Sequence, residues 1–138
     1  MTIRDAVADD IPVIRDMCDE FWRNYHPNGP YDADYFMEFL EENVENPGVQ
    51  IILLDDDLGL MINVMTRSNF SPDAVAHEIV WYTRPEARGR GMMLFKRFKE
   101  WAEESGAKQL FCTVREASPA MERMGFYKTE VSYLKKLN

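Results

Sequence analysis

A strand pattern, a loop with two glycines, a helix pattern and a second strand pattern follow one another in the second half of the chain. Apolar residues predict strands at Val75–Thr83 and Gln109–Val114, and apolar periodicity predicts a helix at Met92–Ser105 between them. The unit spans about 40 residues, which is long enough for a crossover that lays its two strands parallel. The pattern therefore predicts an α/β fold with one parallel strand pair.

The rest of the chain predicts further strands and helices. The expected elements are a strand at Thr2–Ala6, a helix that begins at Asp9–Pro12, a helix at Asp32–Glu45, a hairpin of strands Val49–Leu54 and Leu58–Arg67, a helical turn at Pro119–Arg123 and a last strand at Phe126–Leu137. Steps of three and four residues give each long helix an apolar face. Those faces are Ile11, Ile14, Cys18 and Phe21 in the first helix and Tyr35, Phe36, Phe39 and Leu40 in the second. Together these elements predict a single domain, residues 1–138, with a mixed, mostly antiparallel sheet and about four helices.

Charge and composition narrow the classes of partner. The net charge is −8, and an acidic surface repels phosphates, which argues against nucleic acid. The same charge could attract a cationic amine or serve only solubility. No run approaches the ~20 apolar residues of a membrane helix, and no secretory signal is visible.

The cysteines and histidines are few and scattered. Cys18 and Cys112 form no CxxC pair, and the histidines are His26 and His77, so the sequence predicts no metal site and no disulfide framework. Two buried thiols are expected, which fits a cytoplasmic protein.

The loop Arg88-Gly89-Arg90-Gly91 joins the predicted strand to its helix. Glycines let backbone N–H groups approach a ligand, a helix N-terminus favours anions, and two arginines add positive charge. These features suit a pyrophosphate. The loop lacks the GxxxxGK[ST] and GxGxxG patterns of the commonest phosphate loops, so a plain glycine turn with solvated arginines stays open.

Longer segments carry a resemblance to a known family. The stretch Thr83–Met93, TRPEARGRGMM, resembles the cofactor motif [QR]-x-x-G-x-[GA], preceded by V-x-P-E-x, of the GNAT superfamily of acyl-CoA-dependent N-acyltransferases. Ile3–Ala6 followed by Asp10–Ile14 is similar to the family's first strand and helix, and Glu122–Phe126 to its E-K-L-G-F segment. The resemblance covers nearly the whole chain in the right order. It implies a GNAT-like fold, acetyl-CoA as cosubstrate, a primary amine on a small molecule or protein as acceptor, and a capacity to form a homodimer.

The same resemblance implies a cofactor site. The backbone of the strand end would pair with the pantetheine arm where this strand splays from the strand at Gln109–Val114, and amides of the loop would hold the pyrophosphate. The implied residues are Trp81, Tyr82, Thr83, Arg88, Gly89, Arg90, Gly91, Met92 and Met93.

Two positions depart from the family pattern. Met93 stands where Gly or Ala is usual, and Met121 stands where the family carries a tyrosine, its proposed general acid. A methionine cannot donate a proton. These departures keep a second hypothesis open, a non-catalytic protein that retains the fold for a structural or partner-binding role.

Glu78 is the predicted catalytic base, through a water molecule, because it lies on the strand before the loop, where relatives place a glutamate. Strand alternation puts it on one face with Val80 and Tyr82, and the role depends on whether that face is the cleft. His77 faces the other way and is a second candidate base. Candidates for the missing acid are Tyr82, Tyr127, Tyr133 and Ser118.

The acceptor is expected near the segment that joins the first two helices, where family acceptor pockets are built. It is rich in aromatic and acidic residues that suit an amine, although the aromatics could also simply pack the loop. These residues are Trp22, Tyr25, His26, Tyr31, Tyr35, Asp32 and Asp34.

Overall fold

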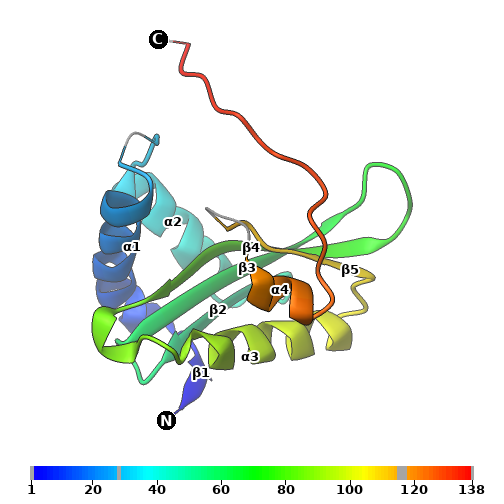
Figure 1. Ribbon diagram of the computed structural model, residues 1–138. Coiled ribbons are helices and arrows are strands. Elements are labelled where there is room, and N and C mark those ends of the chain that lie inside the picture. Colours follow the sequence, from blue (N-terminus) through cyan, green and yellow to red (C-terminus); the bar gives the residue numbers. More distant parts are fainter. Residues whose placement is uncertain (1, 28, 115–117, 138) are drawn as a thin grey trace.

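The computed structural model describes residues 2–27, 29–114 and 118–137 (Figure 1). Its strands are β1 (Ile3–Asp5), β2 (Val49–Leu54), β3 (Gly59–Arg67), β4 (Ala74–Thr83) and β5 (Gln109–Phe111). Its helices are α1 (Ile11–Tyr25), α2 (Ala33–Asn43), α3 (Gly91–Glu104) and α4 (Pro119–Arg123), and single 3₁₀ turns stand at η1 (Ala8–Asp10) and η2 (Pro85–Ala87).

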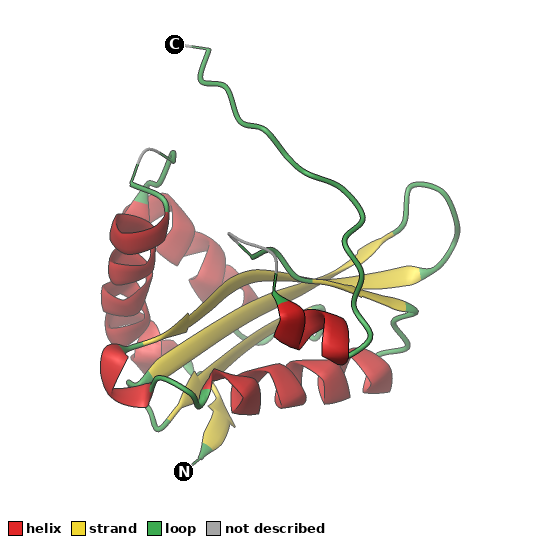
Figure 2. Cartoon of the chain, viewed as in Figure 1, coloured by secondary structure: helices red, strands yellow, loops and turns green. Residues whose placement is uncertain are grey.

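The strands form one sheet (Figure 2), and their order in it is β1-β2-β3-β4-β5. All neighbours are antiparallel except β4 and β5, which are parallel because α3 carries the chain back across the sheet. The mixed, mostly antiparallel α/β sheet predicted from the sequence is therefore confirmed. None of the helices in the described ranges is long and apolar enough to cross a lipid bilayer.

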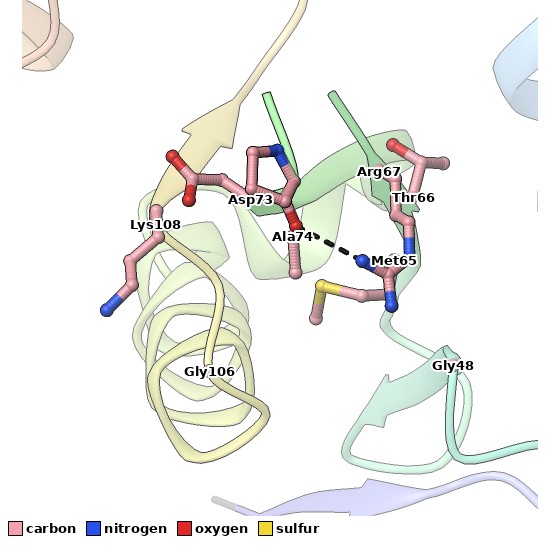
Figure 3. Close-up of a pocket in the computed structure, with 9 residues that line it drawn as sticks. Gly48, Met65, Thr66, Arg67, Asp73, Ala74, Gly106 and Lys108 are labelled. Atoms are coloured by element: carbon pink, nitrogen blue, oxygen red, sulfur yellow. Dashed lines mark hydrogen bonds between the residues drawn. The ribbon is translucent and has the colours of Figure 1, made fainter. Parts of the chain in front are cut away.

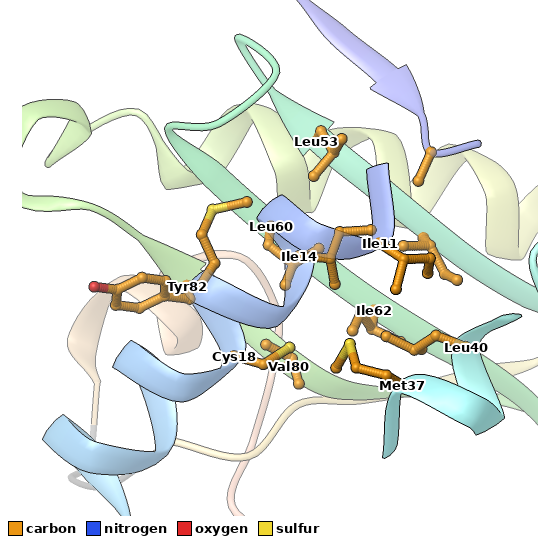
Figure 4. Close-up of a cluster of buried hydrophobic side chains, with 13 residues drawn as sticks. Ile11, Ile14, Cys18, Met37, Leu40, Leu53, Leu60, Ile62, Val80 and Tyr82 are labelled. Carbon is orange, nitrogen blue, oxygen red and sulfur yellow. The ribbon is translucent and has the colours of Figure 1, made fainter. Parts of the chain in front are cut away.

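Helices cover both faces of the sheet, which explains why β2 is almost entirely apolar. On one face α1 and α2 pack against a cluster that includes Ile14, Leu40 and Ile62, all fully buried (Figure 4). On the other face α3 packs through Leu94 and Phe98. Each strand residue therefore faces either the α1/α2 side or the α3 side of the sheet, and this assignment decides what a functional side chain can reach.

The predicted inner face of α2 is partly wrong. Tyr35 is 75% exposed, whereas Met37 and Leu40 are buried. Two residues along a helix turn the side chain by about 200°, so burial of Met37 directs Tyr35 to solvent. The Asp32 carboxylate accepts from the Tyr35 amide and caps the helix at this point.

The predicted last strand, Phe126–Leu137, is also wrong. Residues 126–137 form no regular structure, and the tail leaves the body of the molecule (Figure 1). A strand needs a ladder partner as well as an alternating pattern, and the described chain places none beside this segment. The predicted strand Gln109–Val114 likewise ends early, at Phe111, where its pairing with β4 stops.

Candidate functional site

The glycine loop connects the end of β4 to α3. Gly89 adopts a φ of +90°, which other residues rarely adopt. The indole N–H of Trp81 donates to the carbonyl oxygen of Gly91 at 3.1 Å, so β4 holds the start of α3 directly. A Cβ on Gly91 would lie 3.4 Å from both Trp81 Nε1 and Thr83 Cγ2, so glycine lets loop and strand approach closely.

The backbone amides of this loop divide into two groups. Those of Arg88, Arg90 and Met93 donate inside the loop, to Pro85, Ala87 and Arg90 carbonyl oxygens. The amides of Gly89, Gly91 and Met92 donate to no acceptor in the part of the chain that the structure describes. The same three residues, with Trp81 and Thr83, line a pocket of about 280 Å³. The loop thus presents unpaired donors at a helix N-terminus, an arrangement that binds anions.

The side chains of the loop leave that pocket open. Met93 packs into the α3 side of the core, whereas Met92 is 43% exposed and lines the pocket. The Arg90 guanidinium contacts the Asp55 carboxylate at 3.4 Å. Arg88 is exposed beside the pocket. The bulky residue at position 93 therefore turns away from the free amides.

The strands β4 and β5 separate beside this loop. They pair only through Val75–His77 and Gln109–Phe111, and β4 continues through residues 78–83 without a strand on its outer edge in the described chain. The backbone of Trp81, Tyr82 and Thr83 lies on this free edge. Unpaired strand edges accept an extended partner through backbone hydrogen bonds.

A β-bulge decides where Glu78 points. Met61 and Asn63 lie on the α3 face of β3, and their partners on β4 are Trp81 and Glu78. The register shifts between these pairs and leaves Ile79 as an extra residue in β4. Residues directly opposite in an antiparallel pair share a face, so Glu78 and Trp81 share the α3 face.

The predicted alternation of Glu78 with Val80 and Tyr82 is therefore wrong. Val80 and Tyr82 belong to the core on the α1/α2 face, and the extra residue Ile79 reverses the alternation before them. No local sequence signal marks this bulge. Glu78 consequently lies on the same face of the sheet as Trp81, which lines the glycine-loop pocket.

Burial governs the chemistry of Glu78. One carboxyl oxygen, Oε2, is fully buried without a hydrogen-bond partner among the described residues. Burial raises the pKa of Glu78 to about 7, and a hydrogen bond from the Thr113 amide opposes that rise. A carboxyl group with this pKa can take up and release a proton near neutral pH.

Other predicted acid–base residues have structural partners. The His77 ring stacks on Phe111, with ring centroids 5.0 Å apart, and burial lowers the pKa of His77. The Tyr82 hydroxyl donates to Glu20 at 2.8 Å, and burial, followed by Glu20, raises the pKa of Tyr82 to about 12. The Ser118 hydroxyl accepts from the Met121 amide and caps α4.

The remaining predicted acids are in the tail or absent. Tyr127 and Tyr133 are 78% and 94% exposed in the irregular segment after α4. Met121 is buried in α4. None of the described tyrosines therefore takes the place that the family's tyrosine would have.

The aromatic residues of the expected acceptor region mostly pack on one another. Trp22 stacks on Tyr31 with centroids 5.4 Å apart and contacts His26 at 4.8 Å. The Tyr31 hydroxyl donates to Asp19. Tyr25 packs against Tyr82. The cluster lies on the α1/α2 face, whereas Glu78 lies on the α3 face.

Sequence reasoning missed two polar residues inside the sheet. Gln50 and Asn63 are 4% and 0% exposed, and Asn63 Nδ2 donates to Gln50 Oε1 at 2.9 Å. Each interrupts a run of apolar residues, which is the signal that could have identified them. Asn63 is also the cross-strand partner of Glu78.

A larger pocket, about 630 Å³, lies at the opposite end of β4 from the glycine loop (Figure 3). Its charged residues, Arg67, Asp73 and Lys108, are exposed, and Arg67 donates to the Pro72 carbonyl oxygen. The pocket brings together no buried acid, base or nucleophile from the described chain. Size alone therefore does not favour it as a catalytic site.

Comparisons with known proteins identify the fold. No family model and no curated protein matches the sequence. Among solved structures, a probable acetyltransferase is 20% identical with a TM-score of 0.76, covering 100% of this chain and 99% of its own. A Trypanosoma brucei acetyltransferase is 16% identical with a TM-score of 0.74, covering 99% of each chain. A protein described as a transcriptional regulator from Bacillus halodurans is 18% identical with a TM-score of 0.77, covering 99% of each chain.

These likenesses extend over almost the whole chain at low identity. Further similar structures are also described as acetyltransferases. The chain therefore has the α/β fold of the GNAT acetyltransferases, as the sequence resemblance implied.

Proposed function

We propose that this chain is an N-acetyltransferase that transfers the acetyl group of acetyl-CoA to a primary amine. The observation that carries the proposal is the pocket at the start of α3, on the sheet face that also holds Glu78, where the amides of Gly89, Gly91 and Met92 have no acceptor among the described residues. A diphosphate needs several N–H donors in one place, and these three residues fit that need. Arg88, exposed beside them, adds positive charge.

The free edge of β4 suits the pantetheine arm of acetyl-CoA. Among the described residues, no strand pairs with residues 78–83 on the side away from β3. The pantetheine arm carries amide groups that could pair with this edge as a short added strand would. Trp81 and Thr83 connect the two parts, because both belong to β4 and both line the pocket.

Glu78 supplies the acid–base chemistry in this proposal. The bound cosubstrate offers a thioester, whose carbon–sulfur bond breaks as the amine nitrogen forms the new amide bond. The attacking amine must lose a proton, and the ionised carboxyl group of Glu78 takes it up, directly or through water. The departing thiolate takes a proton from solvent, since Met121 has none to give.

The direct test is binding of acetyl-CoA followed by turnover. Acetyl-CoA at 100 times its dissociation constant should stabilise the fold by ~2.7 kcal/mol and raise the melting temperature by several degrees. Acetyl-pantetheine lacks the diphosphate and serves as the matched control, with a much smaller expected rise. Release of free thiol with a panel of amines then measures transfer. Equal responses to the two compounds would contradict the role of the glycine loop.

The alternative function is a non-catalytic protein that keeps the fold for a structural or partner-binding role. Met121, buried where the family's tyrosine is expected, favours it. The two functions predict different results in the same assays. Stabilisation by acetyl-CoA without thiol release for any amine favours a CoA-binding module, and no stabilisation argues against both the enzyme and such a module.

A further inference from the structure

The three buried side-chain atoms that lack a hydrogen-bond partner in the described chain all lie in one row of the sheet. They are Gln50 Nε2, Asn63 Oδ1 and Glu78 Oε2. Gln50 on β2 is directly opposite Asn63 on β3, and Asn63 is directly opposite Glu78 on β4. The row crosses the α3 face of the sheet.

Such a row is costly inside a core. Its neighbours on the same face, Ile52 and Met61, are fully buried and apolar. Buried amides normally satisfy both their oxygen and their nitrogen. The single bond from Asn63 to Gln50 leaves one end of each amide unused. A functional reason for polar residues at these positions is therefore expected.

A carboxamide can form a hydrogen bond with either protonation state of a carboxyl group. Its oxygen accepts from the protonated form, and its N–H donates to the charged form. With Asn63 Nδ2 engaged by Gln50, the free Asn63 oxygen can accept only from a protonated Glu78. If both amides rotate by half a turn, Gln50 donates to Asn63, and Asn63 offers an N–H to a charged Glu78. Side chains directly opposite in an antiparallel pair lie close enough for this contact.

We propose that Asn63, anchored by Gln50, is the positioning residue of Glu78, accepting a hydrogen bond from its protonated carboxyl group and donating one to its carboxylate. The amide pair thereby keeps the carboxyl group in one orientation while its proton comes and goes. This inference rests on the proposed function only where it assigns the Glu78 proton to the acetyl-transfer reaction.

The other groups around Glu78 do not supply this contact. The Thr113 amide donates to the carboxyl group from beyond the end of β5. The Cys112 thiol stays neutral, because burial and the nearby Glu78 raise its pKa to about 12. The side chains that α3 buries against the sheet are apolar. They are Leu94, Phe95, Phe98 and Ala102.

The test is the titration of Glu78 itself, followed by carboxyl ¹³C NMR and assigned with Glu78→Gln. Asn63→Leu removes the partner of both protonation states. Hydrogen bonds to a charged group are the stronger ones, so the midpoint should move to higher pH by about one pH unit. Met61→Leu, on the same strand and face and equally buried, is the matched control and should leave the midpoint unchanged.

The double variant Gln50→Leu/Asn63→Leu guards against misfolding as an explanation. Replacing both members of a buried polar pair by apolar residues is nearly neutral for stability, so it should melt close to wild type while its Glu78 midpoint moves as in Asn63→Leu. A Glu78 that titrates at the wild-type pH in either variant overturns the proposal. A shifted titration together with an unshifted pH–rate profile supports the positioning and removes Glu78 from the proposed reaction instead.

Discussion

At the scale of single residues, the glycine loop presents backbone N–H groups. The directions of the Met92 and Met93 side chains decide whether the pocket beside these groups stays open. Met93, which stands where the family usually carries Gly or Ala, packs against the core, and Met92 borders the pocket. The amide of Met92 is unpaired in the described chain, so this N–H is available to an anion. A substitution that removes the amide can therefore be separated from one that removes only the side chain.

Met92→Pro should weaken acetyl-CoA binding by roughly 10- to 100-fold, because one hydrogen bond to a charged group is lost. Proline is tolerated in the first turn of a helix, so the fold should survive. Met92→Ala keeps the N–H and should bind within a few-fold of wild type. Isothermal titration calorimetry measures both. Similar affinities for the two variants would argue against a role for the amide.

Glu78→Gln should lower kcat by roughly 10²- to 10⁴-fold with little change in acetyl-CoA affinity. The amide keeps the size of the side chain but cannot accept the amine's proton. In the wild type, kcat/KM should fall as the pH drops below about 7, the pKa of Glu78, because the protonated carboxyl group is no base. Thiol-release kinetics across pH provide the check, and wild-type turnover in Glu78→Gln would exclude Glu78 as the base.

At the scale of elements, a polar cluster joins α1 to the end of β4. The Glu20 carboxylate on α1 accepts hydrogen bonds from the Tyr82 hydroxyl and from Nε and Nη2 of Arg84. Arg84 also donates to the Asp57 carbonyl oxygen, in the turn between β2 and β3. The hydrogen bond from Arg84 lowers the pKa of Glu20, burial opposes this change, and the hydrogen bond from Tyr82 lowers the pKa further. The net result is a lowered pKa. This cluster fixes the strand end from which the glycine loop departs.

Glu20→Gln should destabilise the fold by about 1–3 kcal/mol at pH 7. Because folding lowers the pKa of Glu20, the stability that its carboxylate contributes is complete above the unfolded-state pKa and is lost as the pH falls through the lower folded-state pKa. The difference in stability between Glu20→Gln and wild type should therefore shrink in acid. Asp34→Asn breaks the exposed pair with Arg15, whose side chain is 42% exposed, and should leave stability nearly unchanged. Urea unfolding at several pH values measures both variants, and equal losses would refute the cluster's importance.

At the scale of the whole molecule, burial of Glu78 couples stability to pH in the opposite sense. The folded-state pKa of Glu78, about 7, lies above its unfolded-state value of 4.5, so its contribution to stability is complete below the unfolded-state value and is lost as the pH rises through 7. The folded protein thus gives up stability to keep an ionisable group inside the sheet.

Glu78→Gln should therefore be more stable than wild type at pH 8, by up to about 3 kcal/mol, and similar to it at pH 4. Glutamine stays neutral at both pH values, so the difference isolates the cost of ionising Glu78 in the folded state. Thermal unfolding across this range tests the prediction. A constant difference between the two proteins over the whole pH range would show that Glu78 ionises without cost.

Elements whose signals are local could be predicted from the amino-acid sequence. The order of strands and helices, the parallel pair and the glycine loop follow from periodicity, turn residues and the length of the crossover, all of which act over neighbouring residues. The sequence also supplied Glu78 as a candidate. It failed for the segment Phe126–Leu137, where alternation exists but no ladder partner does.

The way in which the parts of the site meet depends on long-range packing. Pairing with β3 forces the extra residue Ile79 out of register, and that bulge turns Glu78 to the α3 face and places it opposite Asn63. Packing of α3 on the sheet likewise turns Met93 inward and leaves the Met92 amide without an acceptor in the described ranges. A bulge and a helix rotation are set by the best fit between surfaces far apart in the sequence, so no local pattern encodes them.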